Sequence, residues 1–249
     1  YDPVYADFKA RVDELGDFSF FSAYMSQPDC QARHYHPVNI KATDVSLYLN
    51  SHHIDYHAWL MGGKAIPIRV TAHASTGVLE KSYRIQTPDT ITVMVQWQNA
   101  MNDVIGCASY TASWIAQTSD AFTQQRWFYL GSNGEASADQ ARRGYNIVVD
   151  QRLKSPNPLY LNVLPSQAGE FSGQAGYGYQ IFEHFVTAVG SIREGLNVAE
   201  DYIDLLPTLG STTVVTAILD ASRKSLMSNS APIKIHYSDA KPTAIEAES

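Results

Sequence analysis

Four stretches in the middle of the sequence alternate apolar and polar residues, and this period of two constrains the fold more than any other feature. Alternation puts one set of side chains on each face of a β-strand. Strands joined by short connections pair antiparallel, because a parallel pair needs a long crossover. The sequence therefore predicts a broad, mostly antiparallel sheet formed by Ile66–Ala74, Thr90–Gln98, Gly106–Ile115 and Gln125–Leu130.

Helices are predicted at both ends of this region, which makes the fold class α+β with helices packed on one face of a large sheet. The predicted helices follow Asp2-Pro3, run from Thr43-Asp44 to Gly62-Gly63, and cover Tyr179–Arg193 and Ser211–Met227. Further strands are predicted at Phe18–Met25, Tyr145–Asp150, Leu159–Val163 and Ile233–Tyr237, with a hairpin turn at Ser132-Asn133-Gly134. A loop is predicted over Gln27–Lys41, and residues 238–249 are predicted to be a frayed polar tail.

The face of the sheet without helices raises the question of self-association. The predicted strands carry five large aromatic residues: Trp97, Tyr110, Trp114, Trp127 and Tyr129. If several of them share the open face, that surface is too apolar for a monomer, and a homo-oligomer through the open sheet face is expected. If they are divided between the two faces, they belong to the core.

Composition excludes several classes of partner. A chain of 249 residues that is 45% hydrophobic can bury a sizeable core. A net charge of −7 argues against a nucleic-acid partner, and no run approaches the ~20 apolar residues of a membrane span. A single disulfide between Cys30 and Cys107 stays open, but so few cysteines fit a reducing compartment better, so a cytoplasmic location is expected. The start at Tyr1 lacks both Met and a signal peptide, which predicts a piece of a longer protein.

Three histidines and a carboxylate are concentrated in one predicted helix. At 100° per residue, one stripe of this helix contains Tyr48, His52, Asp55 and Trp59. An adjacent stripe is predicted to be the buried face and contains Leu47, Ser51, Ile54, Ala58 and Met61. A titratable pair beside a buried face can serve proton transfer, although the same spacing also fits a simple surface contact.

Two other patterns point to different chemistry. His53 and His57 have the i,i+4 spacing of two metal ligands on a helix, and a third ligand would come from His34 or His36. The glycine spacing of a phosphate-binding turn is present in reverse order, at Gly173, Gly176 and Gly178. This order favours a flexible loop that leads into a helix over a phosphate site. A metal-dependent enzyme therefore stays open as an alternative.

Several segments together resemble the C-terminal domain of the Gfo/Idh/MocA (glucose-fructose oxidoreductase, inositol dehydrogenase) family over residues 1–237. The likeness lies in Asp2-Pro3-Val4-Tyr5-Ala6, Leu15-Gly16-Asp17-Phe18, His52-His53-Ile54-Asp55 with Trp59-Leu60-Met61-Gly62-Gly63, and Tyr129-Leu130-Gly131-Ser132-Asn133-Gly134-Glu135. The resemblance implies the substrate-binding and oligomerisation domain of an oxidoreductase acting on a sugar or polyol hydroxyl. It also implies that NAD or NADP is bound mainly by a domain absent from this chain, so that the isolated chain is inactive.

The resemblance also assigns roles to individual residues. The family helix pattern Asp-x-Gly-x-His-x-x-Asp falls on Tyr48, Asn50, His52 and Asp55, so His52 would handle the hydroxyl proton beside Asp55. Tyr48 stands where the family has Asp, and it would orient His52 from one turn away. Substrate contacts are expected from Arg126, Tyr177 and Tyr179. The replacement at Tyr48 keeps one alternative open, a non-catalytic ligand-sensing or regulatory protein of the same fold.

Overall fold

The computed structural model divides the chain into two compact units. It describes residues 1–39, 43–119, 121–142, 147–149, 152–154, 159–160, 162–165, 171–203, 205–238 and 241–247. The sheet unit contains Val12–Ala141 and Thr213–Ser249, and the α5 unit contains Tyr1–Arg11 and Arg142–Thr212.

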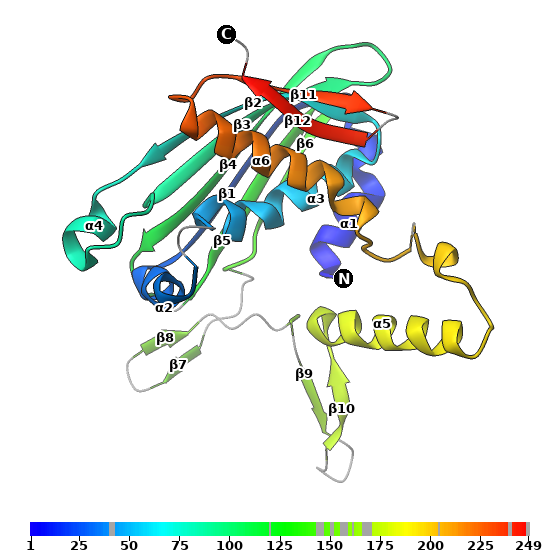
Figure 1. Cartoon of the computed structure of the whole chain (residues 1–249). Coiled ribbons are helices and arrows are strands. Elements are labelled where there is room, and N and C mark those ends of the chain that lie inside the picture. Colours follow the sequence, from blue (N-terminus) through cyan, green and yellow to red (C-terminus); the bar gives the residue numbers. More distant parts are fainter. Residues whose placement is uncertain are drawn as a thin grey trace. The chain divides into compact units, whose positions relative to one another are not determined.

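The sheet unit is built on eight strands in the order β12-β11-β2-β3-β4-β1-β5-β6 (Figure 1). The strands are β1 (Phe18–Pro28), β2 (Ala65–Ser75), β3 (Thr90–Asn99), β4 (Ile105–Ala116), β5 (Gln124–Gly131), β6 (Gly134–Asp139), β11 (Ile233–Ser238) and β12 (Lys241–Ala247). β1 and β4 pair parallel, and the other neighbours pair antiparallel. The mostly antiparallel sheet predicted from the period-two pattern is confirmed.

Two helices, α3 (Ser51–Met61) and α6 (Thr213–Met227), lie on the same face of this sheet (Figure 1). The shorter helical elements of the unit are η1 (Val12–Leu15), α2 (Asp29–Asn39), η2 (Ser46–Asn50) and α4 (Val78–Tyr83). Buried residues alternate with exposed or half-buried ones along β3 and most of β4, as expected for a sheet covered on one side. The predicted α+β class is confirmed.

The α5 unit consists of short strands and one long helix. Its elements are α1 (Pro3–Arg11), β7 (Ile147–Val149), β8 (Arg152–Lys154), β9 (Asn162–Pro165), β10 (Phe171–Ala175), α5 (Tyr177–Arg193), η3 (Ala199–Tyr202) and η4 (Gly210–Thr212). Asp2 caps α1 as its position before Pro3 predicts, because its Oδ1 accepts the Val4 N–H at 3.0 Å. β7 and β9 overlap the strands predicted at 145–150 and 159–163, parts of which lie outside the described residues.

The five aromatic residues of the central strands belong to the core, so they do not form an apolar open face. Trp97, Tyr110, Trp114, Trp127 and Tyr129 are each 5% exposed or less. Trp127 contacts Tyr56 of α3, with ring centroids 5.4 Å apart, which places it on the helix-covered face. The alternative that these aromatics belong to the core is therefore confirmed, and they give no reason to expect a homo-oligomer.

His57 of α3 lies at the centre of this aromatic core. Its ring stacks on Phe21 at 4.4 Å and contacts Phe18 and Trp97, each at 4.7 Å. Its Nδ1 and the Tyr110 hydroxyl are 2.5 Å apart and share a hydrogen bond. His57 therefore joins α3 to β1, β3 and β4 at one point.

Two segments differ from the sequence prediction. The loop expected over Gln27–Lys41 contains α2, whose polar composition and Pro37 hide the helical period. The frayed tail expected over 238–249 contains β12, which pairs antiparallel with β11 through backbone hydrogen bonds that need no apolar pattern. α4 was not predicted, because its cap comes from a distant residue, Asp89, whose carboxylate accepts the Val78 and Leu79 N–H groups at 2.8 Å.

The two buried histidines make stability depend on pH. His53 and His57 are 1% and 0% exposed, and burial lowers the pKa of each to about 3. In the unfolded chain both side chains titrate near pH 6.5. Between about pH 6.5 and 3 the unfolded state therefore binds about two more protons, and these two residues lower the free energy of unfolding by about 2.7 kcal/mol per pH unit of acidification.

This dependence can be measured by urea unfolding at several pH values between 4 and 8. Substituting either histidine, as His53→Gln or His57→Gln, should remove about half of that slope, because one titrating group is lost. An unchanged slope in both variants would show that these histidines do not carry the acid sensitivity.

Candidate functional site

The helix that carries the candidate residues begins and ends where the sequence predicts. The Asp44 carboxylate accepts the Leu47 N–H at 2.9 Å, which satisfies a free donor of the first turn. Gly62 adopts a left-handed conformation with φ 49°, and its N–H donates to the Ala58 carbonyl at 3.0 Å. A glycine in this conformation ends a helix at little cost.

A π-helical turn, η2, immediately precedes α3 and fixes it to the sheet. Asn50 is fully buried, and its Nδ2 donates to Ser46 Oγ at 2.9 Å and to the Ile91 carbonyl of β3 at 3.4 Å. π-turns widen the helix locally and are frequent at functional sites. This one sets the rotation of α3 just before His52.

His52 and Asp55 lie on the exposed side of α3, as a catalytic pair requires. The buried side contains His53, Ile54, Tyr56, His57, Leu60 and Met61. The predicted buried face is therefore only partly correct. Ile54 and Met61 are buried, whereas Leu47, Ser51 and Ala58 are only half-buried.

The electrostatics of the pair favour a neutral imidazole. Although the His52 side chain is exposed, neighbouring atoms partly desolvate it and lower its pKa below the usual value, and this effect outweighs the Asp55 carboxylate, which raises the pKa. Burial likewise raises the pKa of Asp55 more than His52 lowers it. The Asp55 carboxylate by itself would favour the charged form of His52, but desolvation has the larger effect on its pKa. A neutral imidazole near pH 7 can accept a proton.

Tyr48 makes a different contact from the one expected of it. Its ring stacks on Trp114 of β4, with centroids 5.3 Å apart and planes 15° apart. The π-turn between Tyr48 and His52 departs from the 100° spacing on which their shared stripe was predicted. A role for Tyr48 in orienting His52 stays a prediction.

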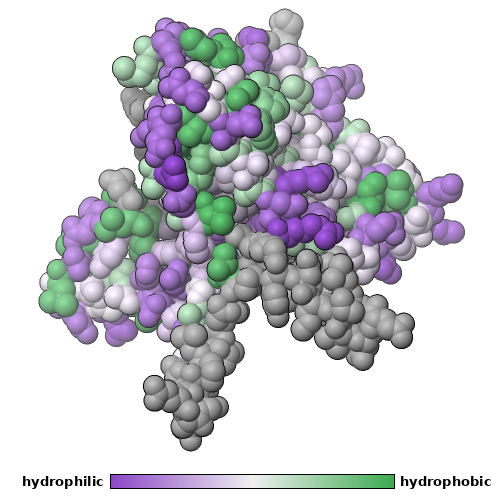
Figure 2. All heavy atoms as spheres, turned by 180° about the vertical axis from the view of Figure 1, so that it is seen from behind, coloured by the Kyte–Doolittle hydropathy of each residue, from purple (hydrophilic) through white to green (hydrophobic). Residues whose placement is uncertain are grey.

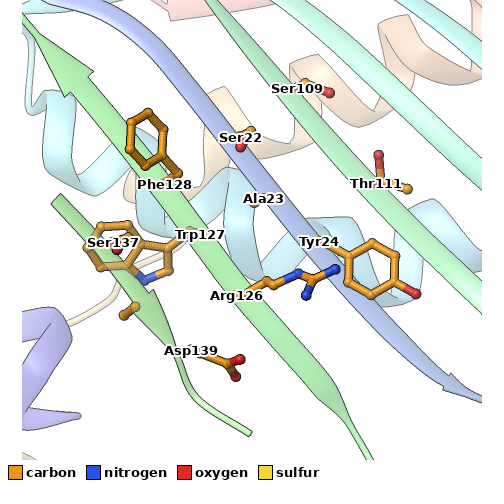
Figure 3. Close-up of a pocket in the computed structure, with 11 residues that line it drawn as sticks. Ser22, Ala23, Tyr24, Ser109, Thr111, Arg126, Trp127, Phe128, Ser137 and Asp139 are labelled. Atoms are coloured by element: carbon orange, nitrogen blue, oxygen red, sulfur yellow. The ribbon is translucent and has the colours of Figure 1, made fainter. Parts of the chain in front are cut away.

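Arg126 is not brought to His52, because it lies on the opposite face of the sheet. Neighbouring residues of a strand point to opposite faces, and Trp127 faces α3. The Arg126 guanidinium lies over the Tyr24 ring at 5.0 Å, on the face without helices (Figure 3). There it borders a hollow of about 470 Å³ whose other polar side chains are Ser22, Ser109, Thr111, Ser137 and Asp139.

The two other residues predicted to contact substrate belong to the α5 unit. Tyr177 and Tyr179 lie in the first turn of α5, and the Tyr177 ring meets Tyr160 edge-on at 5.2 Å. A substrate contact from either tyrosine stays a prediction.

The histidines that suggested a metal site are used in packing. His53 and His57 are buried, and His57 Nδ1 shares its hydrogen bond with Tyr110. Within the described part of the chain, no group of three or more His, Cys, Asp or Glu residues could hold a metal ion. The side chain of His36 lies outside the described residues, and Cys30 and Cys107 are both free.

The glycines at the start of α5 allow its backbone to lie close to the backbone of Leu159 and Tyr160. The Tyr177 and Gly178 N–H groups donate to the Leu159 and Tyr160 carbonyls at 3.0 and 2.9 Å. A Cβ at Gly176 would come within 2.6 Å of the Tyr160 carbonyl oxygen. These helix N-terminal amides are already used, so the turn does not fit the pyrophosphate of a dinucleotide, which needs such amides. None of the helices described is long and apolar enough to cross a membrane.

Comparison with solved structures relates the fold to known proteins. No protein-family model and no curated protein matches the sequence. Scyllo-inositol dehydrogenase from Lactobacillus casei, solved with NAD(H) and scyllo-inositol, superposes over 94% of this chain and 62% of its own, with 15% identity and a TM-score of 0.61. Myo-inositol 2-dehydrogenase from Lactobacillus plantarum superposes over 95% of this chain and 62% of its own, with 16% identity and a TM-score of 0.61. GenD2 from gentamicin A biosynthesis, solved with NAD, superposes over 95% of this chain and 62% of its own, with 14% identity and a TM-score of 0.59.

The extent of these matches agrees with the predicted resemblance to one domain of a longer dehydrogenase. Nearly all of this chain is matched, and it spans about 62% of the length of these dehydrogenases. The chain therefore has the fold of a large part of the inositol dehydrogenases, and its predicted resemblance to the Gfo/Idh/MocA family is confirmed at the level of the fold.

Proposed function

We propose that this chain provides the substrate-binding surface and the proton-transfer histidine of an NAD- or NADP-dependent oxidoreductase that acts on a sugar or polyol hydroxyl. The observation that carries the proposal is the exposed His52–Asp55 pair on α3, within a fold shared with inositol dehydrogenases. Partial desolvation lowers the pKa of the exposed His52 side chain, which supports its role as a base.

His52 would accept the hydroxyl proton of the substrate. An alcohol carbon loses hydride readily only as its hydroxyl proton is removed, so a base within hydrogen-bond reach is required. The neutral His52 ring can receive that proton, and the Asp55 carboxylate then stabilises the imidazolium that forms. In the reverse direction, the imidazolium returns the proton to the carbonyl oxygen.

The dinucleotide would be held outside the described residues. A nicotinamide group supplies the hydride acceptor in such reactions, and the protein supplies orientation and the proton acceptor. The only glycine-rich turn that leads into a described helix, Gly173–Gly178, has its amides occupied by the Leu159 and Tyr160 carbonyls. The described residues of this chain would therefore contribute contacts to the substrate and the proton acceptor.

The face of the sheet without helices would associate with a second copy of this chain. Arg126 and Asp139 stand directly opposite each other on β5 and β6. A two-fold axis would bring Arg126 of one copy to Asp139 of the other, so the patch is self-complementary. Figure 2 shows hydrophobic and hydrophilic residues interspersed in the view from behind. On the face without helices, Tyr24 and Phe128 lie among Ser22, Ser109, Thr111 and Ser137 (Figure 3). Such a mixed surface suits an interface between soluble subunits.

The catalytic role is tested by turnover of the complete protein that contains this chain. His52→Ala should lower kcat for polyol oxidation by roughly 10²–10⁴, the usual contribution of a general acid–base group. Its circular dichroism should not change, because the side chain is exposed. His73→Ala, at an exposed position on β2, is the matched control. Normal turnover in His52→Ala would contradict the catalytic role of His52 and favour the alternative of a non-catalytic ligand-sensing protein.

The pH profile tests the pairing with Asp55. Because protonated His52 cannot accept a proton, kcat/KM for oxidation should fall on the acid side, with an apparent pKa below about 6.5. Asp55→Asn removes the charge that raises the His52 pKa, so the acid limb should move to lower pH. A limb that stays in place or moves upward would contradict the assignment.

Cofactor binding is tested on the chain itself. We expect calorimetric titration with NAD(H) or NADP(H) to show weak binding or none, because the α5 N-terminal amides are taken. Micromolar affinity would mean that this chain holds a dinucleotide site of its own.

Self-association is tested by sedimentation velocity at tens of micromolar. The wild-type chain should form a dimer, and Arg126→Asp should shift it to monomer by setting two acidic residues against each other. Adding Asp139→Arg to that variant should restore the dimer, since the charges are only exchanged. Arg223→Glu on α6 is the control. A wild-type monomer, or a dimer indifferent to Arg126→Asp, would count against this interface.

A further inference from the structure

The hollow on the face of the sheet without helices has short side chains at its centre. Ser22 of β1 and Ser109 of β4 are direct neighbours in the sheet, and Phe128 of β5 stands on the other side of Ser22. Serine fills much less space than the larger residues around it, so a depression of about 470 Å³ remains (Figure 3). Small-molecule sites typically have volumes of roughly 300–1,000 Å³, so this hollow can hold a ligand of that kind.

Arg126 gives the hollow a positive charge that no neighbouring carboxylate neutralises by direct contact. In the register of the sheet, Arg126 stands between Tyr24 of β1 and Asp139 of β6. Its guanidinium lies over the Tyr24 ring at 5.0 Å, so the side chain extends away from Asp139 (Figure 3). It makes no hydrogen bond or ion pair with any residue among those described, which leaves its N–H donors available to a ligand.

Asp139 is held by its own stretch of chain and not by Arg126. Its Oδ1 accepts the Ala141 N–H at 3.0 Å. The carboxylate nevertheless lines the same hollow, so it acts on any charge that is bound there. Because Coulomb energy scales with charge, Asp139 repels a dianion such as phosphate about twice as strongly as a monoanion. The hollow therefore suits an anion of single charge.

Hydroxyl groups offer a second kind of contact in the same place. Ser22, Ser109 and Ser137 line the hollow, and their hydroxyls make no hydrogen bond to another side chain within the part of the chain that is described. A serine hydroxyl both donates and accepts, so it matches the hydroxyl of a sugar. A guanidinium only donates, and its planar fork matches a carboxylate.

We propose that this hollow binds a small monocarboxylate that carries several hydroxyls, such as a sugar acid. Its carboxylate would accept two N–H groups of Arg126, and its hydroxyls would exchange hydrogen bonds with the serines. The inference goes beyond the proposed function, because the site lies on the opposite face of the sheet from α3. A second copy of the chain is proposed to place its Asp139 against the same Arg126, so the ligand and the second copy compete for one guanidinium.

Calorimetric titration with gluconate tests the ligand class, and sorbitol is the matched neutral control. Both compounds have six carbons and several hydroxyls, but only gluconate has a carboxylate. Sorbitol should bind about 10-fold or more weakly than gluconate, because it cannot form the charged hydrogen bonds to Arg126. Equal binding of the two compounds would overturn the proposal.

Substitutions separate the roles of Arg126 and Asp139. Arg126→Gln should weaken gluconate binding by about 10-fold or more, because charged hydrogen bonds are lost. Arg223→Gln, at an exposed arginine of α6, should bind as the wild type does. Asp139→Asn keeps an acceptor for the Ala141 N–H but removes the negative charge, so it should strengthen binding by about 2- to 5-fold. Unchanged affinity in Arg126→Gln, or weaker binding by Asp139→Asn, would contradict this site.

Sedimentation velocity distinguishes failure of this site from failure of the proposed dimer. Saturating gluconate should shift the dimer toward monomer, and sorbitol should not, because only a carboxylate competes for Arg126. A chain that is always monomeric, yet binds gluconate through Arg126, would contradict the dimer and support the site. A dimer that persists in saturating gluconate would contradict the competition. If gluconate fails to bind even to Asp139→Asn, in which the dimer contact is weakened, the hollow is not a carboxylate site.

Discussion

The contact between α3 and the sheet decides which side chains of this helix meet solvent. His57 is packed among Phe18, Phe21 and Trp97 and hydrogen-bonded to Tyr110, so the rotation of the helix is fixed from inside the core. The buried Asn50 fixes the turn before it to β3. Once these two points are set, His52, Asp55 and Trp59 face outward. The candidate site is thus a consequence of core packing one turn away.

Burial has opposite consequences on the two sides of the same helix. On the inner side, removal from water keeps His53 and His57 neutral and makes folding sensitive to acid. On the outer side, partial removal from water lowers the pKa of His52, which favours its neutral form. Desolvation thus makes the folded state less stable in acid through His53 and His57, and it favours the neutral, proton-accepting form of His52.

The two faces of the sheet separate the two proposed roles. The helix-covered face contains the aromatic core and supports α3, whereas the other face presents Arg126, Asp139 and a set of hydroxyl groups. Because neighbouring strand residues point to opposite sides, Arg126 and Trp127 serve different surfaces although they are adjacent in the chain. The proposed subunit contact on the open face is therefore separate from the proposed substrate site on α3.

The sequence by itself determined the elements that repeat a local pattern. The four alternating strands, the helix ended by Gly62 and the hairpin at Ser132-Asn133-Gly134 follow from period and turn chemistry, which act between near neighbours. Only the tertiary structure decided which histidines are buried, because a π-turn and contacts with distant strands set the rotation of α3. It also decided that Arg126 faces away from His52, and that α4 forms under a cap from Asp89. These features depend on contacts with residues outside the local sequence pattern, so the pattern alone does not predict them.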